Sequence, residues 1–383
     1  MNVQAWTDAR TGADLRARGS LKWSATEPGT IPAWVAEMDL PLAPAITAAL
    51  RDAVDRELTG YLPAYLDTRV GEATAAWQQR FGWSVDPADV HPVASVVGGL
   101  RIVIEHLTAI RAPVVLPTPA YMPFLTVPEL FGRRLITVPM IDDGDRFVLD
   151  LPAISAALCP GALLLLTNPH NPTGRVFGAD ELLALAEVVE QAGAIVFADE
   201  IHAPLVFSGR VHRPYAALSS VTAAHSVTGT SASKGWNIPG LACAQLILSN
   251  DWSRDRFAAL NPFVWYGATP MGAVATVAAY TAGADHLAEV VEYLRAGRDL
   301  FAAGLAQTLP TARFHPMEGT YLAWLDLRAI GRDPADVAAI ARVRGVDGLL
   351  CGMPGFLRLN LALPHRLVAE MAVRLGSLGS GER

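Results

Sequence analysis

Lysine is almost absent from this chain of 383 residues. Of the 30 basic residues, only Lys22 and Lys234 are lysines, and the other 28 are arginines. A compositional preference for arginine explains most of that ratio. Arginine cannot take over every role of lysine, however, because a guanidinium stays protonated whereas a buried amine can lose its proton and form a Schiff base. A function that needs a primary amine therefore has two candidate residues.

The sequence also lacks clustered positive charge and long polar tracts. Its net charge is -7, which argues against a nucleic-acid or anionic-membrane surface and favours a small-molecule partner. Apolar residues make up 51% of the chain and charged residues 17%, which excludes disorder. A length of 383 residues exceeds what one hydrophobic core usually supports, so we expect two domains.

No apolar run is long enough to cross a bilayer or to act as a signal peptide. The longest weakly polar runs, 161–166 and 273–284, are too short, so we expect a cytoplasmic protein without membrane contact. Cysteine is scarce as well. Cys159, Cys243 and Cys351 are odd in number, widely spaced and set among apolar neighbours, which favours buried structural thiols over disulfides or a metal site.

Helical and strand patterns alternate from about residue 45, which predicts an α/β fold with a mostly parallel sheet. The predicted elements are helices at 43–58 and 180–192 and strands at 114–117, 135–139, 163–167 and 194–198. After residue 283 the pattern changes to a separate α+β lobe. Its predicted elements are a helix through residue 305, strands at 321–327 and 356–361, and a closing helix at 367–375. The first forty residues lack the alternation, and we expect them to join that lobe or to form an arm.

Two polar motifs lie in the second half of the α/β part. Lys234 lies among small hydroxyl residues in TSASKGWNIPG, residues 230–240, which suits the binding of an oxyanion such as phosphate, although a polar loop with a solvated lysine has the same composition. Asp199 follows the apolar run 194–198 and opens the sequence DEIH. A carboxylate at that point is costly unless a cation or a donor faces it. Asp199 therefore either caps the next segment or pairs with a protonated cofactor ring.

Two more motifs complete the candidate site. The sequence NPHNPTG at 168–174 favours a rigid loop that holds the amide of Asn171 in one place. Tyr121 lies between Pro119 and Pro123, where its ring is suited to stack on a planar group, although core tyrosines share this signature. Because ligands bind beyond the carboxyl ends of strands in parallel α/β sheets, we expect the motifs to converge.

Five motifs follow one another along the chain, and they contain Tyr121, Asn171, Asp199, the segment 231–234 and Arg358. Their order resembles that in the fold-type I pyridoxal-phosphate enzymes of the aminotransferase class I/II superfamily. Within it the chain resembles most the cystathionine β-lyase, or C-S lyase, branch of the MalY/PatB type. The strings that carry this resemblance are KW at 22–23, WVAEMD at 34–39, NPHNPTGRVF at 168–177, DEIH at 199–202, NIPGL at 237–241, GTYLAWLD at 319–326 and FLRLN at 356–360.

The resemblance implies the fold-type I architecture of a pyridoxal-phosphate-dependent transferase. A large cofactor-binding domain, residues 44–279, is expected to carry a mostly parallel seven-stranded sheet. Residues 280–383 are expected to form a smaller α+β C-terminal domain, together with residues 1–43, which include an N-terminal arm. The active unit is expected to be a homodimer with a shared active site.

The same resemblance implies a role for each site residue. Lys234 is the expected catalytic lysine, which holds pyridoxal 5'-phosphate as a Schiff base and moves the Cα proton. Asp199 is expected to pair with the pyridinium nitrogen, and Tyr121 to stack on the ring. Asn171 and His202 are expected to hydrogen-bond the ring 3-oxygen. The expected phosphate contacts are Ser231, Ser233, the backbone amides of Val96 and Val97, and Tyr61 of a neighbouring subunit. Arg358 and Ala36 are the expected substrate-binding residues, with Arg358 holding the α-carboxylate. Lys22 has no role in this scheme and is expected at the surface of the N-terminal arm.

The expected reaction is β-elimination from an L-cysteine S-conjugate, which yields a thiol, pyruvate and ammonia. An aminotransferase, or an enzyme of decarboxylation-linked deamination, begins with the same steps and remains an alternative. A regulatory protein that keeps the fold without turnover ranks last, because it requires loss of Lys234 or an attached DNA-binding segment, and the sequence shows neither.

Three positions depart from the family pattern. Many relatives in the superfamily carry a phosphate-binding arginine eight residues after the lysine, where this chain has Ala242. Glu37 replaces the usual aspartate, and Trp236 stands where phenylalanine is common. These changes are expected near the substrate side, which favours a specialised sulfur conjugate as substrate.

Overall fold

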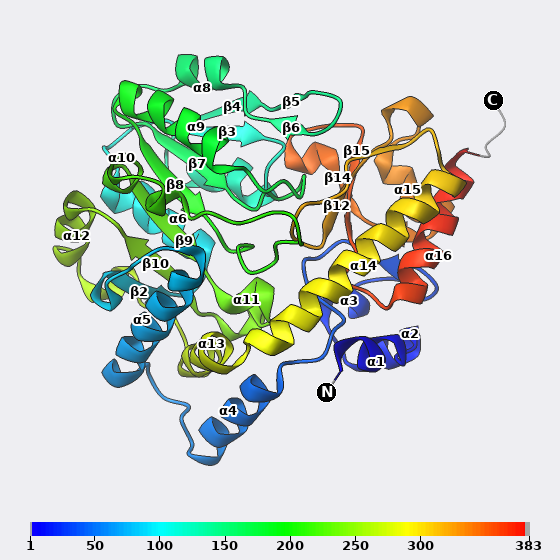
Figure 1. Cartoon of the computed structure of the whole chain (residues 1–383), viewed down its shortest axis with the longest axis horizontal. Helices are drawn as coiled ribbons and strands as arrows, with labels where there is room; N and C mark the ends of the chain where they lie inside the picture. Colours follow the sequence, from blue (N-terminus) through cyan, green and yellow to red (C-terminus); the bar gives the residue numbers. More distant parts are fainter. Residues whose placement is uncertain (1, 380–383) are drawn as a thin grey trace.

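A seven-stranded sheet forms the centre of the larger lobe, with the strand order β2-β10-β9-β8-β7-β3-β4 (Figure 1). The computed structural model describes residues 2–379, and residues 1 and 380–383 of the expected domains lie outside it. The strands are β2 (Val90–Val93), β3 (Val114–Thr118), β4 (Leu135–Pro139), β7 (Leu163–Thr167), β8 (Ile195–Asp199), β9 (Ser226–Thr230) and β10 (Ala244–Leu248). All neighbouring strands are parallel except β10, which is antiparallel to both β2 and β9. The predicted mostly parallel sheet is confirmed.

Both faces of this sheet are buried, which explains the continuous apolar run of β7. Leu163 and Leu165 pack in the core that α6 (Val96–Ile102) covers, whereas Leu164 and Leu166 pack in the core that α9 (Ala179–Ala192) covers. The other helices of this lobe are α4 (Pro44–Asp55), α5 (Ala64–Gln78), α7 (Val127–Leu130), α8 (Leu151–Ala157), α10 (Ser220–Ala224), α11 (Ala232–Gly235), α12 (Asp251–Ala258) and α13 (Pro270–Ala282). A short hairpin consists of β5 (Ile141–Asp142) and β6 (Phe147–Val148).

The smaller lobe is built on an antiparallel sheet of order β11-β12-β15-β14. Its strands are β11 (Arg313–Phe314), β12 (Leu322–Asp326), β14 (Val346–Asp347) and β15 (Phe356–Asn360). The long helix α14 (Ala284–Thr308) leads from the larger lobe into this one and packs along α16 (His365–Gly376) (Figure 1). A short helix, α15 (Val337–Ala341), completes the lobe. The change of pattern predicted after residue 283 is therefore observed.

The N-terminal residues dock on the smaller lobe, which is one of the two alternatives that the sequence left open. The helices α1 (Val3–Asp8), α2 (Gly12–Ala17) and α3 (Leu21–Ser24) precede β1 (Ile31–Pro32). The backbone N–H of Val3 donates to the carboxylate of Glu289 in α14 at 2.8 Å. Strand β1 pairs in parallel with β13 (Val343–Arg344). These contacts tie the arm to α14 and to the smaller lobe.

Two expectations about individual residues are wrong. Lys22 is not at the surface: its side chain is 0% exposed and forms an ion pair with Asp39. Cys159 is exposed, because it lies in the turn between α8 and β7 and not on the inner face of an element, whereas Cys243 and Cys351 are buried as expected. No helix among residues 2–379 is long and apolar enough to span a bilayer.

Gly229 in β9 permits α6 to approach the sheet closely. A Cβ atom at this position would lie 2.7 Å from Cζ of Phe197 and 2.9 Å from Cγ1 of Val96, which is the first residue of α6. We expect Gly229→Ala to destabilise the folded protein by about 1–3 kcal/mol, because the core must shift to admit the methyl group. Thermal melting of the variant measures this loss. Gly240→Ala is the matched control, since nothing lies within 4 Å of its Cβ, and an equal loss in both variants would contradict the packing argument.

Candidate active site

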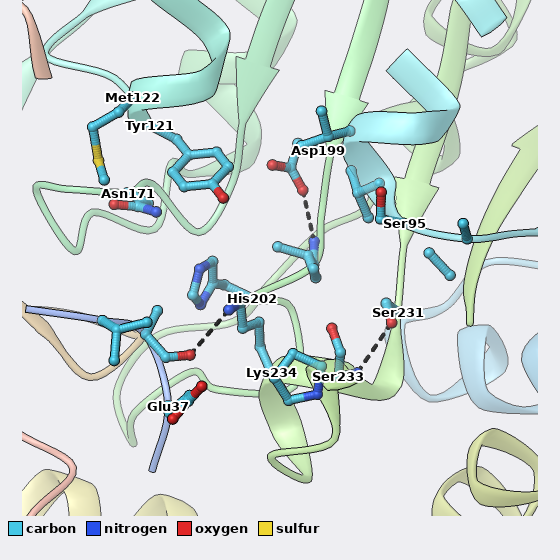
Figure 2. Close-up of a pocket in the computed structure, with 18 of the residues that line it drawn as sticks. Glu37, Ser95, Tyr121, Met122, Asn171, Asp199, His202, Ser231, Ser233 and Lys234 are labelled. Carbon is cyan, nitrogen blue, oxygen red and sulfur yellow. Dashed lines mark hydrogen bonds between the residues drawn. The ribbon is translucent and has the colours of Figure 1, made fainter. Parts of the chain in front are cut away.

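A cavity of about 330 Å³ lies at the carboxyl ends of β3, β7, β8 and β9. All predicted site residues except Tyr61 line it. They are Ala36, Val96, Val97, Tyr121, Asn171, Asp199, His202, Ser231, Ser233, Lys234 and Arg358. Because the four strands are parallel neighbours, the four motifs that follow them meet at one edge of the sheet, as expected. Figure 2 shows Tyr121, Asp199, His202 and Lys234 around the same space.

Lys234 extends from α11 into the cavity, where its Nζ donates a hydrogen bond to the carbonyl oxygen of Ala36 at 3.0 Å (Figure 2). Burial, together with the nearby cation Arg358, lowers the pKa of this amine to about 8, although Asp199 and Glu37 oppose the shift. About a tenth of the amine is therefore unprotonated at pH 7, which is the form that attacks a carbonyl or removes a proton.

Asp199 ends β8 and is buried, with 5% of its surface exposed. One carboxylate oxygen accepts a hydrogen bond from the backbone N–H of Ile201 at 3.1 Å. Burial raises the pKa of Asp199 to about 7, because the charged form is poorly solvated. Within residues 2–379 it forms no ion pair, and its hydrogen bond with Ile201 caps the next segment, which was one of the two expectations.

Arg358 lies in the middle of β15, so the smaller lobe contributes it to the cavity. Its Nη1 donates to the side-chain oxygen of Asn171 at 3.1 Å, and its Nη2 donates to the carbonyl of Trp34 at 3.0 Å. Arg358 is 2% exposed, and its Nε has no hydrogen-bond acceptor in the described part of the chain. A buried guanidinium with free donors suits a carboxylate ligand.

His202 and Tyr121 add an uncharged ring on either side of the cavity. His202 is buried, and its Nδ1 has no partner among the described residues. Burial holds the pKa of His202 well below 6.5, and the nearby cations Lys234 and Arg358 act in the same direction, so the ring is neutral. Burial also raises the pKa of Tyr121, which stays a phenol and packs edge-on against Phe124 at 5.5 Å.

One end of the cavity presents hydroxyl and amide groups. Ser231 donates to the carbonyl of Cys243 at 2.9 Å and accepts from the N–H of Ser233 at 3.1 Å. Helix α6 begins at Val96, so its first N–H groups have no acceptor within the helix. Ala242 is not among the lining residues, and the cationic side chains that line the cavity are Lys234 and Arg358. The hydroxyl and amide end therefore has donors but no cation of its own.

The sequence motifs missed part of the wall. Trp34, Glu37 and Met122 also line the cavity, and the hydroxyl of Tyr321 donates to the carbonyl of Ala36 at 2.9 Å. The signal for Trp34, Glu37 and Tyr321 was their place in the strings WVAEMD and GTYLAWLD, whereas the signal for Met122 was its place next to Tyr121. Glu37 thus lies at the cavity, as expected from its departure from the family pattern.

Trp236 does not lie near the substrate side, and that expectation is wrong. Its ring packs edge-on against Trp77 and Tyr280, with ring centroids 5.1 and 5.6 Å apart. Its Nε1 donates to the carbonyl of Gly283 at 3.0 Å. The side chain therefore joins the core under α11 and points away from the cavity.

Tyr61 lies apart from the cavity, in the loop between α4 and α5. It is 84% exposed and touches Tyr266 edge-on at 6.1 Å between ring centroids. The structure of one chain therefore does not bring Tyr61 to the site.

The stability of the ligand-free protein should depend on the titration of Asp199. Its pKa is raised from 3.8 to about 7, so between pH 4 and 7 the folded protein keeps a proton that the unfolded chain has lost. The free energy of unfolding of the wild type then falls by about 1.4 kcal/mol for each unit by which the pH rises within that window. An asparagine at this position cannot titrate, so the free energy of unfolding of Asp199→Asn should rise relative to that of the wild type as the pH increases from 4 to 7. The total rise should be about 4 kcal/mol at most, and the difference should stay constant above pH 7. Melting temperatures of both proteins across this range test the sign, and a difference independent of pH would contradict it.

Comparison with known proteins identifies relatives over nearly the whole chain. Residues 35–375 match the family described as aminotransferase class I and II. The cystathionine β-lyase of Corynebacterium glutamicum is 34% identical over 374 residues, which cover 95% of this chain and 98% of that protein. The cystathionine β-lyase PatB of Bacillus subtilis is 32% identical over 89% of this chain and 92% of that protein. The crystal structure named as a PLP-dependent β-cystathionase from Corynebacterium diphtheriae has a TM-score of 0.91 and 36% identity, and the match covers 98% of this chain and 100% of that one.

These similarities confirm the resemblance that the motifs indicated, and they agree with the position of the cavity at the carboxyl ends of the strands. The chain belongs to the aminotransferase class I and II family of fold-type I pyridoxal-phosphate enzymes, within its cystathionine β-lyase branch.

Proposed function

We propose that the protein is a pyridoxal-phosphate-dependent C-S β-lyase that cleaves an L-cysteine S-conjugate to a thiol, pyruvate and ammonia. The observation that carries this proposal is the pairing of a buried amine, Lys234, with a buried carboxylate, Asp199, that lacks a cation of its own. Within the described residues Asp199 has one backbone hydrogen bond and no ion pair, whereas a protonated pyridine nitrogen would supply a charged partner.

The residues of the cavity fit pyridoxal phosphate from end to end. Asp199 would pair with the ring nitrogen, Tyr121 would stack on the ring, and Asn171 and His202 would hydrogen-bond its 3-oxygen. His202 is suited to this contact because it is neutral and its Nδ1 is unpartnered. When bound, the cofactor supplies a carbonyl that condenses with amines and a ring that accepts the electron pair left at an amino acid's Cα.

The hydroxyl and amide end of the cavity would hold the phosphate. Ser233 and the first N–H groups of α6, at Val96 and Val97, are hydrogen-bond donors of the kind that bind oxyanions. The hydroxyl of Ser231 would join them by turning away from the carbonyl of Cys243. Because Ala242 stands where many relatives have arginine, these neutral donors carry more of the binding. Tyr61 of a second subunit would add a further hydroxyl, and its 84% exposure in the single chain supports a homodimer with shared sites.

The substrate's α-carboxylate would bind Arg358, whose free Nε and buried position favour a two-point contact. Lys234 would then take the proton from Cα, because its amine has a pKa of about 8 and is partly unprotonated at neutral pH. Loss of that proton allows the Cβ–S bond to break, with the sulfur leaving as a thiol. Hydrolysis of the remaining three-carbon fragment gives pyruvate and ammonia.

Similarity to the cystathionine β-lyases over 95% and 89% of the chain supports elimination over transamination. The cavity residues themselves serve both reactions, since both begin with removal of the Cα proton. The sulfur substituent would lie near Trp34, Glu37 and Met122, which line the cavity beside Arg358 and Tyr121.

Products distinguish the two reactions directly. Protein loaded with pyridoxal phosphate and incubated with L-cystathionine or an S-alkyl cysteine should release pyruvate and free thiol in equal amounts. Lys234→Ala should abolish this release and remove the visible absorbance of the cofactor–lysine Schiff base, because no other buried amine lines the cavity within the described residues. Stoichiometric conversion to the pyridoxamine form without pyruvate would favour an aminotransferase, and an unchanged spectrum in Lys234→Ala would refute the cofactor assignment.

Arg358 provides a second test, directed at the substrate. We expect Arg358→Ala to raise the KM for cysteine S-conjugates by about a hundredfold, since a buried charge-assisted contact contributes about 2–3 kcal/mol. Arg358→Lys should recover only part of this loss, because an ammonium cannot make the two-point contact. Arg256→Ala is the control: this arginine donates to the carbonyl of Leu107 outside the cavity, and a comparable rise in KM there would argue against a specific carboxylate site.

A further inference from the structure

Lys22, the lysine without a role in the proposed reaction, is held by three acceptors in the interior. Its ammonium lies 2.9 Å from a carboxylate oxygen of Asp39 and donates to the carbonyl oxygens of Ala362 at 3.2 Å and Glu37 at 3.3 Å. Two carbonyl oxygens accept hydrogen bonds from this ammonium and the carboxylate oxygen adds an ion pair, so three oxygen atoms converge on one nitrogen. A planar guanidinium spreads its donors over a larger fork and cannot meet acceptors that converge on one point. This geometry gives a reason why lysine persists here in an arginine-rich chain.

The segment that Lys22 holds, residues 34–39, lines the cavity with its first four residues, 34–37. The side-chain amide of Asn360, the last residue of β15, donates to two carbonyl groups of this segment, both at 2.6 Å. The backbone N–H of Asp39 donates to the carbonyl of Ala362 at 3.0 Å. Lys22 therefore closes a set of contacts that fixes the segment to the strand that carries Arg358.

Two carbonyl groups of the same segment contact the two cationic side chains of the cavity. Arg358 donates to the carbonyl of Trp34, and Lys234 donates to the carbonyl of Ala36, both at 3.0 Å. Figure 2 shows this side of the cavity, with Glu37 beside Lys234. A shift of the segment would therefore move the acceptors that orient both side chains.

Stability alone does not account for this arrangement. A buried ion pair is often no more stabilising than apolar side chains of similar volume, because both charges must be desolvated. The Lys22–Asp39 pair has side-chain exposures of 0% and 4%, so that cost applies in full. What apolar residues could not supply is a donor that bridges the carbonyl oxygens of Glu37 and Ala362, in addition to the separate donors that these oxygens have in Asn360 and in the backbone N–H of Asp39.

We propose that Lys22 is a positioning residue, which holds the segment 34–39 in register with Lys234 and Arg358 and thereby sets the affinity for the amino-acid substrate. The substrate part of this proposal rests on the proposed function, through the role given to Arg358. The positioning of the segment does not depend on it.

The test uses the double variant Lys22→Met/Asp39→Asn in the full chain loaded with pyridoxal phosphate. Replacing Lys22 alone leaves a buried unpaired carboxylate, whereas the double change removes both charges. It also keeps a side-chain oxygen at position 39 as acceptor for Nε1 of Trp23, which in the wild type donates to Asp39 at 2.9 Å. We expect a melting temperature close to that of the wild type, at least tenfold faster amide hydrogen exchange in the peptide that contains residues 34–39, and a tenfold higher KM for L-cystathionine with kcat changed less than threefold. A tenfold change in KM is about 1.4 kcal/mol of binding.

Leu15→Ala is the matched control, because Leu15 is fully buried in α2 of the same arm and makes none of the hydrogen bonds of the segment. This variant should lower the melting temperature without changing exchange in residues 34–39 or the KM. Wild-type exchange in the double variant, or an equal rise in KM for Leu15→Ala, would overturn the positioning role. If the wild type cleaves no S-conjugate, the proposed function fails, while the exchange experiment still decides whether Lys22 holds the segment.

Discussion

The burial of charged groups at the carboxyl ends of the parallel strands is the constraint from which the properties of this site follow. Desolvation raises the pKa of Asp199 to about 7 and lowers that of Lys234 to about 8. Both shifts arise because the end of β8 and helix α11, which follows β9, place these side chains in a space that the smaller lobe covers. Asp199 has no ion-pair partner among the described residues, and the pKa of Lys234 is close to neutral pH. Both groups are then available for a ligand that carries a ring cation and a carbonyl.

The covering lobe is as much a part of the site as the sheet. Arg358 comes from β15, and the segment 34–39 comes from the N-terminal arm, yet both contact residues that follow strands of the larger lobe. Asn237 adds to this connection, since its side-chain amide both accepts from and donates to the backbone of Met38, each at 2.8 Å. At the site the two lobes therefore meet through hydrogen bonds, several of them to main-chain groups, in addition to the apolar core that they share.

Much of the site could be predicted because polar residues after buried strands are conspicuous. Tyr121, Asn171 and Asp199 each follow a short apolar run, and the parallel order of the strands brings such residues together. The predictions for Lys22, Cys159 and Trp236 were wrong for one common reason. The exposure and the direction of a side chain depend on the residues that pack against it. The local sequence pattern does not reveal such residues, because an acceptor such as Ala362 lies 340 residues away from Lys22.

The sequence by itself determined the alternation of helices and strands, the four motifs and the family to which they belong, because each of these is a local pattern of apolar, polar and turn-forming residues. Tertiary structure alone decided how the two lysines differ. Lys234 lies in a cavity where its amine can act on a ligand, whereas Lys22 is enclosed by Asp39, Glu37 and Ala362. The physical reason is that the pKa and the reach of an amine are set by the acceptors and the solvent around it, and folding brings those from distant parts of the chain.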